Sequence, residues 1–310
     1  MEVAVRGETA EITLGPVLFN WQPERWRDFY FGIADEGAIS AVYLGEVVCS
    51  KRSPLFLPHF EEVSERLAAA GKTVIFSTLS EVMLNLDRQA VKSVCASPDA
   101  LVEANDAAAV FHLQGRPHHV GPFMNVYNAE TAAVLARRGA RNFCLPAELP
   151  AGAIRALCAG TQALGVTVEI QVFGRVSLAL SARCYHARAH GRTRDSCLFV
   201  CENDPDGLEL RTLDGRPFLA VNGIQTLSLE CLNLIHELPE LRAMGVSRFR
   251  LSPHTCDMAA VAAVVRGVLD QRMTAEEGAA RLEAMNLPFP FSNGFYHGKP
   301  GNRWTDAAPH

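Results

Sequence analysis

The feature that most constrains the fold is a regular alternation of short apolar segments with amphipathic ones. Residues 11–21, 38–44 and 73–78 have the pattern of strands, and residues 24–34 and 58–70 between them have the pattern of helices. Pro23 opens the first helix and Gly71 follows the second. Further strands are expected at 101–103, 120–126, 142–145, 166–173 and 247–251, and further helices within 80–98 and at 107–114, 129–138, 151–164, 232–244 and 257–271.

Strands separated by helices at this interval predict a parallel sheet with helical crossovers. Six or more such units favour an α/β fold of the (β/α) TIM-like barrel type, complete or incomplete, with a doubly wound sheet as the alternative. Asp214-Gly215, between strands expected at 208–213 and 217–221, predicts a hairpin that interrupts the barrel. We therefore expect one barrel domain over 1–310, a cysteine-bearing insertion at about 181–222 and a C-terminal tail at about 288–310.

Charge and hydropathy exclude several classes of protein. The net charge of −5 does not provide the basic surface that nucleic acids require, so no nucleic-acid partner is expected. Residues 1–8 contain two acids and no apolar run, unlike a secretory signal, and no segment has the roughly 18 apolar residues of a membrane span. An odd number of cysteines, nine, then indicates free or metal-bound thiols in a reducing compartment. A cytoplasmic location is expected.

Three of the nine cysteines lie within eighteen residues: Cys184, Cys197 and Cys201. Thiolates that a short loop brings together bind zinc or an iron-sulfur cluster. Their spacings of twelve and three intervening residues differ from the two tight pairs of a zinc knuckle. They fit a [4Fe-4S] cluster better, with a fourth ligand from elsewhere in the chain. Zinc binding stays the alternative.

The other cysteines occur singly. Cys95, Cys158 and Cys231 lie in expected helices and Cys144 in an expected strand, each beside apolar neighbours, so core packing is favoured for all four. Packing is also favoured over a ligand role for Cys256.

Charged and polar residues gather in two sets. Basic residues near the cysteines would stabilise an anionic cluster or bind a carboxylate substrate: Lys51, Arg52, Arg175, Arg183, Arg188, Arg192 and Arg194. His186 and His190 are candidate proton donors or exposed loop residues. Polar residues at the expected strand ends could meet on one rim of the barrel, or serve as helix caps and ion-pair partners: Glu46, Glu103, Asn125, Asn128, Glu148 and Glu169.

Several segments between about Leu14 and Pro253 are similar to one known group of proteins. They are residues 42–52, 101–106, 125–131 and 221–226, and Ser181-Ala182-Arg183-Cys184 with Cys197 and Cys201. On these segments the chain resembles the collagenase-like peptidase superfamily, and within it the branch that serves ubiquinone synthesis without molecular oxygen. By position, the four [4Fe-4S] cluster ligands of that branch fall on Cys49, Cys184, Cys197 and Cys201.

The resemblance implies a subunit of an oxygen-independent hydroxylase complex for ubiquinone precursors, working as a heterodimer with a sister protein and with prephenate as the suggested oxygen donor. Four protein ligands leave no open iron, so electron transfer or a structural role is favoured over Lewis-acid catalysis. A polyprenylated substrate also implies a lipid-carrying partner or a surface groove.

The peptidase signature of the wider superfamily is absent, as are G-x-S-x-G, H-E-x-x-H and G-K-[ST] motifs. Three alternatives stay open: a zinc-binding non-catalytic scaffold, a superfamily peptidase and an RNA-modification factor. The last of these conflicts with the negative charge.

Overall fold

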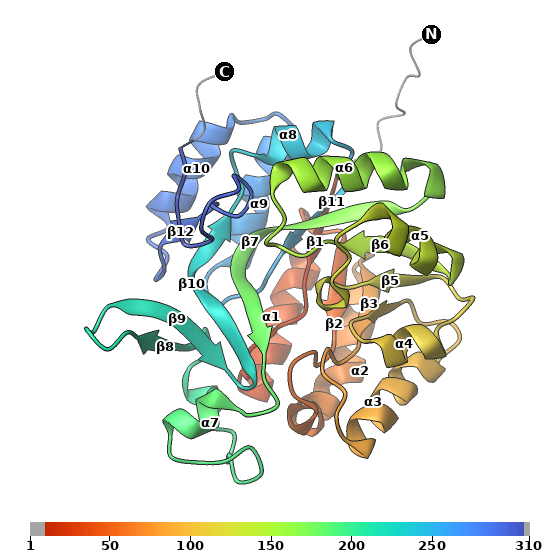
Figure 1. Ribbon diagram of the computed structural model, residues 1–310, viewed down its shortest axis with the longest axis vertical. Coiled ribbons are helices and arrows are strands. Elements are labelled where there is room, and N and C mark those ends of the chain that lie inside the picture. Colours follow the sequence, from red (N-terminus) through yellow and green to blue (C-terminus); the bar gives the residue numbers. More distant parts are fainter. Residues whose placement is uncertain (1–9, 307–310) are drawn as a thin grey trace.

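Eight parallel strands close into a barrel in the computed structural model, which describes residues 10–306 (Figure 1). The strand order is β11-β1-β2-β3-β4-β5-β6-β7, and β7 pairs with β11 to complete the ring. The strands are β1 (Glu11–Leu14), β2 (Ala41–Leu44), β3 (Thr73–Ser77), β4 (Val102–Ala104), β5 (His118–Val120), β6 (Ala140–Cys144), β7 (Thr167–Leu180) and β11 (Arg248–Leu251). The predicted (β/α) barrel is therefore confirmed and is closed, which excludes the doubly wound sheet.

Helices cover the outside of the barrel between successive strands (Figure 1). They are α1 (Pro23–Asp35), α2 (Ser53–Ala69), α3 (Asn85–Ala96), α4 (Ala107–His112), α5 (Ala129–Arg137), α6 (Ala151–Thr161), α8 (Leu238–Ala243), α9 (Met258–Leu269) and α10 (Ala275–Ala284). Asp106, Asn128 and Asp257 start α4, α5 and α9, because each side chain accepts a hydrogen bond from a backbone N–H of the first turn. Among the described residues, no helix is both long and apolar enough to cross a bilayer.

Strand β7 continues beyond the barrel, seven residues past its predicted end at 173. Its continuation pairs with β10 (Gln225–Asn233) in antiparallel orientation, and β10 pairs with β9 (Pro217–Asn222), which pairs with β8 (Leu208–Arg211). The predicted helix at 232–244 is wrong in its first half, because residues 232–233 complete β10, residues 234–237 connect it to α8, and only α8 is helical. Cys231 thus lies in a strand, although it is buried as expected.

The predicted strand at 120–126 is also largely wrong. β5 ends at Val120, and a short 3-10 helix, η2 (Pro122–Met124), follows. Pro122 has no N–H to donate to a neighbouring strand, so it ends the pairing there. The C-terminal end of the chain returns to the extension through β12 (Phe291–Ser292), which pairs with β10. Residues 307–310 of the expected tail lie outside the described residues.

The expected insertion at about 181–222 contains α7 (Tyr185–Ala189), the 3-10 helix η4 (Val200–Asn203), β8 and β9. Figure 1 shows α7 beside the end of the long β7 and away from the barrel helices. The extension of β7 thus positions the cysteine-bearing segment outside the barrel wall, beyond the strand ends.

The barrel interior contains a buried polar network centred on Arg250. Its Nε and Nη2 donate to Glu169 at 3.0 Å, and Nη2 also donates to Glu103 at 2.7 Å. Glu169 accepts further hydrogen bonds from Thr13, Tyr43 and Asn142. Burial by itself would raise the pKa of Glu169, but the charge and hydrogen bonds of Arg250 outweigh burial and lower this pKa to about 2. Glu169 is therefore a structural carboxylate and not a rim residue.

Candidate functional site

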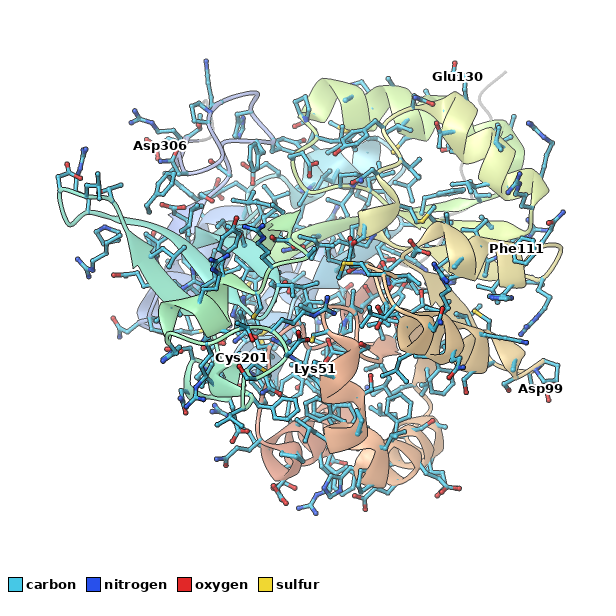
Figure 2. The ribbon with its side chains drawn as sticks, turned by 60° about the horizontal axis from the view of Figure 1, so that its bottom comes forward. Lys51, Asp99, Phe111, Glu130, Cys201 and Asp306 are labelled. Carbon is cyan, nitrogen blue, oxygen red and sulfur yellow. The ribbon has the colours of Figure 1, made fainter. Side chains whose placement is uncertain are left out.

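Four cysteines from two distant parts of the chain line one small cavity: Cys49, Cys184, Cys197 and Cys201. Cys49 precedes the 3-10 helix η1 (Ser50–Arg52), Cys184 is the N-cap of α7, and Cys201 lies in η4. Figure 2 labels Lys51 and Cys201, on these two parts of the chain, and both residues line the same cavity. The structure therefore brings together all four residues that the resemblance selects.

Asn222 holds the cysteine-bearing segments in place. Its Oδ1 accepts hydrogen bonds from Arg52 Nη2 at 2.6 Å and from the backbone N–H of Asn20 at 3.2 Å. Its Nδ2 donates to the backbone oxygens of Cys201, at 3.0 Å, and Asp204, at 2.8 Å. One buried side chain thus connects the strand extension, the start of the chain and the loop that carries Cys201.

The next residue must be glycine. Gly223 has a φ of +67°, and a Cβ there would lie 2.3 Å from Arg52 Nη2. Its backbone oxygen is 3.2 Å from Cys184 Sγ, which donates to it. Residues 221–226, one of the segments that carry the resemblance, therefore set the position of both the arginine and a cysteine.

The surroundings of the cysteines fit an all-thiolate metal centre. All nine cysteines are free thiols, so none of the four is committed to a disulfide. Burial raises the pKa of Cys49 and of Cys184, while the charge of Arg52 acts in the opposite direction. Thiols that are buried and protonated bind a metal by releasing their protons, and a nearby cation stabilises the resulting negative charge.

Only some of the expected basic residues reach this cavity. Lys51, Arg52 and Arg194 line it. Arg175 does not, because its Nη1 donates to the backbone oxygens of Ser228, at 2.8 Å, and Leu229. Arg183, Arg188 and Arg192 are not among the lining residues. His186 and His190 lie beside the cysteines with their rings stacked at 5.4 Å, centroid to centroid.

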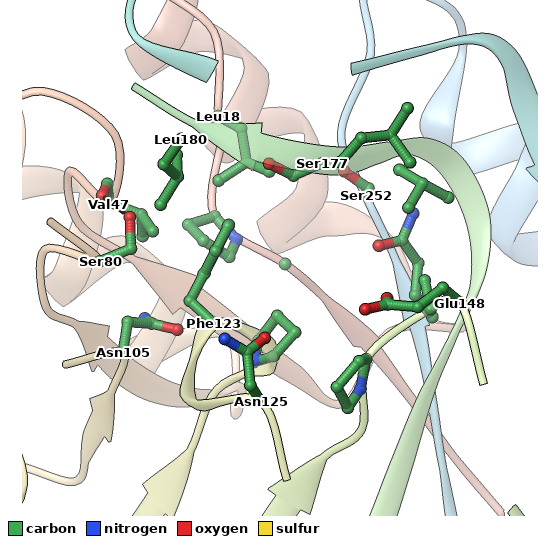
Figure 3. Close-up of a pocket in the computed structure, with 18 of the residues that line it drawn as sticks. Leu18, Val47, Ser80, Asn105, Phe123, Asn125, Glu148, Ser177, Leu180 and Ser252 are labelled. Carbon is green, nitrogen blue, oxygen red and sulfur yellow. Dashed lines mark hydrogen bonds between the residues drawn. The ribbon is translucent and has the colours of Figure 1, made fainter. Parts of the chain in front are cut away.

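A second cavity, of about 520 Å³, lies at the carboxyl ends of the barrel strands (Figure 3). Glu103, Asn125 and Glu148 line it, as expected of rim residues. The other strand-end candidates have structural partners instead. Asn128 caps α5, and Glu46 accepts from the backbone N–H groups of Val48 and Cys49 at 2.8 and 2.9 Å.

Two buried polar atoms of this rim cavity have no hydrogen-bond partner among the described residues: Asn105 Oδ1 and Ser177 Oγ. Buried polar groups are nearly always paired, so these two atoms are the candidate hydrogen-bonding groups for a ligand of this cavity. Sequence reasoning missed both residues, and Arg250, which also lines the cavity. Asn105 follows β4 directly and could have been found from that position, whereas Ser177 lies in the unpredicted continuation of β7.

An apolar cluster that forms one wall of the rim cavity also contains three of the four cysteines. Leu18, Val47, Phe123 and Leu180 line the rim cavity, and the same four residues belong to the apolar cluster that packs against Cys49, Cys184 and Cys197. The two sites are therefore connected through one apolar cluster.

A third cavity, of about 480 Å³, lies between α2 and α3. Its lining is mainly apolar and includes Trp26, Phe56, Leu57, Phe60 and Val94. Leu57 remains 64% exposed, so the cavity has an apolar mouth at the surface.

The chain matches one known family of proteins. A family model described as "Peptidase family U32" matches residues 25–306. Among solved structures, the chain is similar to one described as a dihydrodipicolinate synthase family protein from Coccidioides immitis. The two share 8% sequence identity over 91% of this chain and 78% of that chain, with a TM-score of 0.38. Such a distant likeness does not bear on function.

Proposed function

Because the chain belongs to peptidase family U32, we propose that it is the UbiV-like member of that family, a [4Fe-4S]-binding subunit required for oxygen-independent hydroxylation of ubiquinone precursors. It works as a heterodimer with a UbiU-like partner. Cys49, Cys184, Cys197 and Cys201 would hold the cluster, which supplies one-electron chemistry when bound.

The observation that supports this proposal best is the apolar cluster that connects the two sites. An oxygen-sensitive cluster needs shielding from solvent, and Leu18, Val47 and Leu180 provide an apolar screen on its barrel side. The same apolar cluster lines part of the rim cavity. A substrate in that cavity would then lie near the iron-sulfur cluster, an arrangement that would suit electron transfer.

The rim cavity favours a neutral ring over an anion. Glu81, Glu103 and Glu148 line it, and Arg250, the cation among its lining residues, is already bound to two carboxylates. A phenolic hydroxyl could bond either Asn105 Oδ1 or Ser177 Oγ while the ring packs on Phe123. The charges do not favour a dicarboxylate such as prephenate in this position.

The apolar cavity between α2 and α3 would accept part of a polyprenyl chain, since lipid tails need an apolar lining with an open mouth. A lipid-carrying partner would then deliver the rest of the molecule.

Metal analysis and quinone measurement test the proposal. Anaerobically purified protein is expected to be brown, with about four irons and equivalent sulfide per chain. Cells that lack the gene are expected to lose ubiquinone under anoxia and to keep it in air. Colourless protein that contains zinc would instead support the non-catalytic scaffold, and an unchanged anoxic quinone content would disprove the biosynthetic role.

Replacing Ser177 with alanine tests the rim cavity. We expect anoxic ubiquinone formation, in cells that express only this variant, to fall by about two- to tenfold, because a substrate hydrogen bond contributes roughly 0.5–1.5 kcal/mol. Iron content should not change, since Ser177 makes no contact with the cysteines in the described structure.

Ser247→Ala is the matched control. Its Oγ is also buried and unpartnered among the described residues, but Ser247 does not line the rim cavity. Equal quinone formation in the two variants would remove Ser177 from the site.

A further inference from the structure

A second cluster of metal-ligating side chains lies beside the cysteines, formed by His186, His190 and Asp204. One ligand atom from each lies within 4.8 Å of the other two. His186 Nε2 is 3.0 Å from Asp204 Oδ2, and His190 Nε2 is 4.0 Å from the same oxygen. In a tetrahedral zinc site with bonds of about 2.0–2.1 Å, ligand atoms lie about 3.3–3.5 Å apart. The ligand atoms are therefore close enough to bind one ion once the two nearly parallel rings turn so that both nitrogens face it.

The orientation of His186 shows which of its atoms is available. Its Nδ1 lies 3.1 Å from the backbone oxygen of Val221, and a carbonyl oxygen can only accept, so Nδ1 carries a hydrogen. Metal-binding histidines are held in this way, with one ring nitrogen bonded to a backbone carbonyl and the other facing the ion. Nε2 then presents its lone pair to Asp204.

The second ring nitrogen of His186, Nε2, has no hydrogen-bond donor beside it. His186 is fully buried, and its Nε2 makes no hydrogen bond of acceptable geometry among the described residues. A lone pair and a carboxylate oxygen repel each other at 3.0 Å unless a cation lies between them. His190 points a further nitrogen at the same carboxylate, which a single bridging proton would not require.

We propose that His186, His190 and Asp204 bind one divalent transition-metal ion, Zn²⁺, separately from the four cysteines. The spacing of the histidines, four residues apart at α7, places both rings on one face, and Asp204 supplies an oxygen from the residue that ends η4. A fourth position would be open to water.

The ion would connect the two segments that carry cysteines. Cys184 starts α7 and Cys201 lies in η4, so a metal shared by His190 and Asp204 fastens these segments to each other. Such a clamp would keep the cysteine cavity assembled while it contains no cluster, and zinc would raise the melting temperature of cluster-free protein.

The test uses the full chain, dialysed against Zn²⁺ and analysed for zinc and iron together. His190→Ala and Asp204→Asn are suitable variants because both side chains are partly exposed, at 35% and 25%. Each is expected to hold about one zinc ion fewer per chain than the wild type and to lose the zinc-dependent rise in melting temperature. The control His236→Ala, a histidine outside this cluster, should match the wild type.

Measuring zinc and iron separately distinguishes the zinc-site proposal from the iron-sulfur cluster proposal. Wild-type protein that binds this zinc ion but contains no iron would count against the [4Fe-4S] assignment alone. Equal zinc content in the wild type and both variants, including no zinc in any of them, would overturn the second metal site.

Discussion

Replacing Cys197 with serine is expected to remove the iron-sulfur cluster, lowering iron from about four per chain to less than half of that and abolishing the brown colour. A serine hydroxyl stays protonated at neutral pH and is a poor ligand for iron, whereas the cysteine binds as a thiolate. Cys197 is only half-buried at the edge of the cavity, so the fold should tolerate the change. Iron, sulfide and visible absorption, measured without oxygen, give the result.

Cys256→Ser is the matched control, because Cys256 is also a half-buried free thiol but does not line the cavity. The iron content of this variant should equal that of the wild type. Cys49→Ala then tests the ligand that the resemblance alone selects, and it should behave as Cys197→Ser does. If either Cys49→Ala or Cys197→Ser retains a complete cluster, that cysteine is not a ligand.

Replacing Arg250 with methionine is expected to lower the free energy of unfolding by about 3–5 kcal/mol. The methionine fills most of the volume, but it leaves Glu103 and Glu169 as uncompensated charges inside the barrel. Arg250 also covers the ring of Tyr43, 3.9 Å from its centroid, and this contact is lost as well. Chemical denaturation at neutral pH measures the change. Arg155→Ala, which removes an exposed ion pair with Glu240, should cost no more than about 1 kcal/mol.

The pH dependence of the stability of the Arg250→Met variant shows whether unpaired buried charge or lost packing causes the destabilisation. In the wild type, Glu169 stabilises the fold above the pKa of an unfolded glutamate, about 4.3, and this contribution disappears as the pH falls toward 2. Without Arg250, the effect of burial, which raises the pKa of Glu169, is no longer outweighed, so mild acid should stabilise the variant. Adding Glu103→Gln and Glu169→Gln should recover much of the loss. If acid lowers the free energy of unfolding of the variant as it does that of the wild type, lost packing rather than unpaired charge causes the destabilisation.

The barrel could be predicted because each strand and helix is encoded locally. Asp106, Asn128 and Asp257 are helix caps that can be read from sequence, and the apolar strands alternate with helices at a steady interval. The antiparallel extension could not be predicted in full. The alternation of β10 is broken by register shifts against β7, between Thr226 and Leu227 and between Leu227 and Cys231, so its strand pattern is weak.

The residues of the candidate sites likewise include some that the sequence predicts and others that it does not. The clustering of Cys184, Cys197 and Cys201 is visible in the sequence, whereas the place of Cys49 came only from the resemblance and depends on the chain bringing η1 beside α7. Arg250 was missed because its role exists only once β11 closes the ring beside β7 and β1. Asp204 was missed because nothing in its local sequence marks it as a neighbour of His186.

Strand β7 is shared by the barrel and by the segment that carries the cysteines. Its residues 176–180 line the rim cavity, and only three residues separate its end from Cys184. A molecule that displaces this strand from the cavity side would therefore also move Cys184, one of the four proposed cluster ligands.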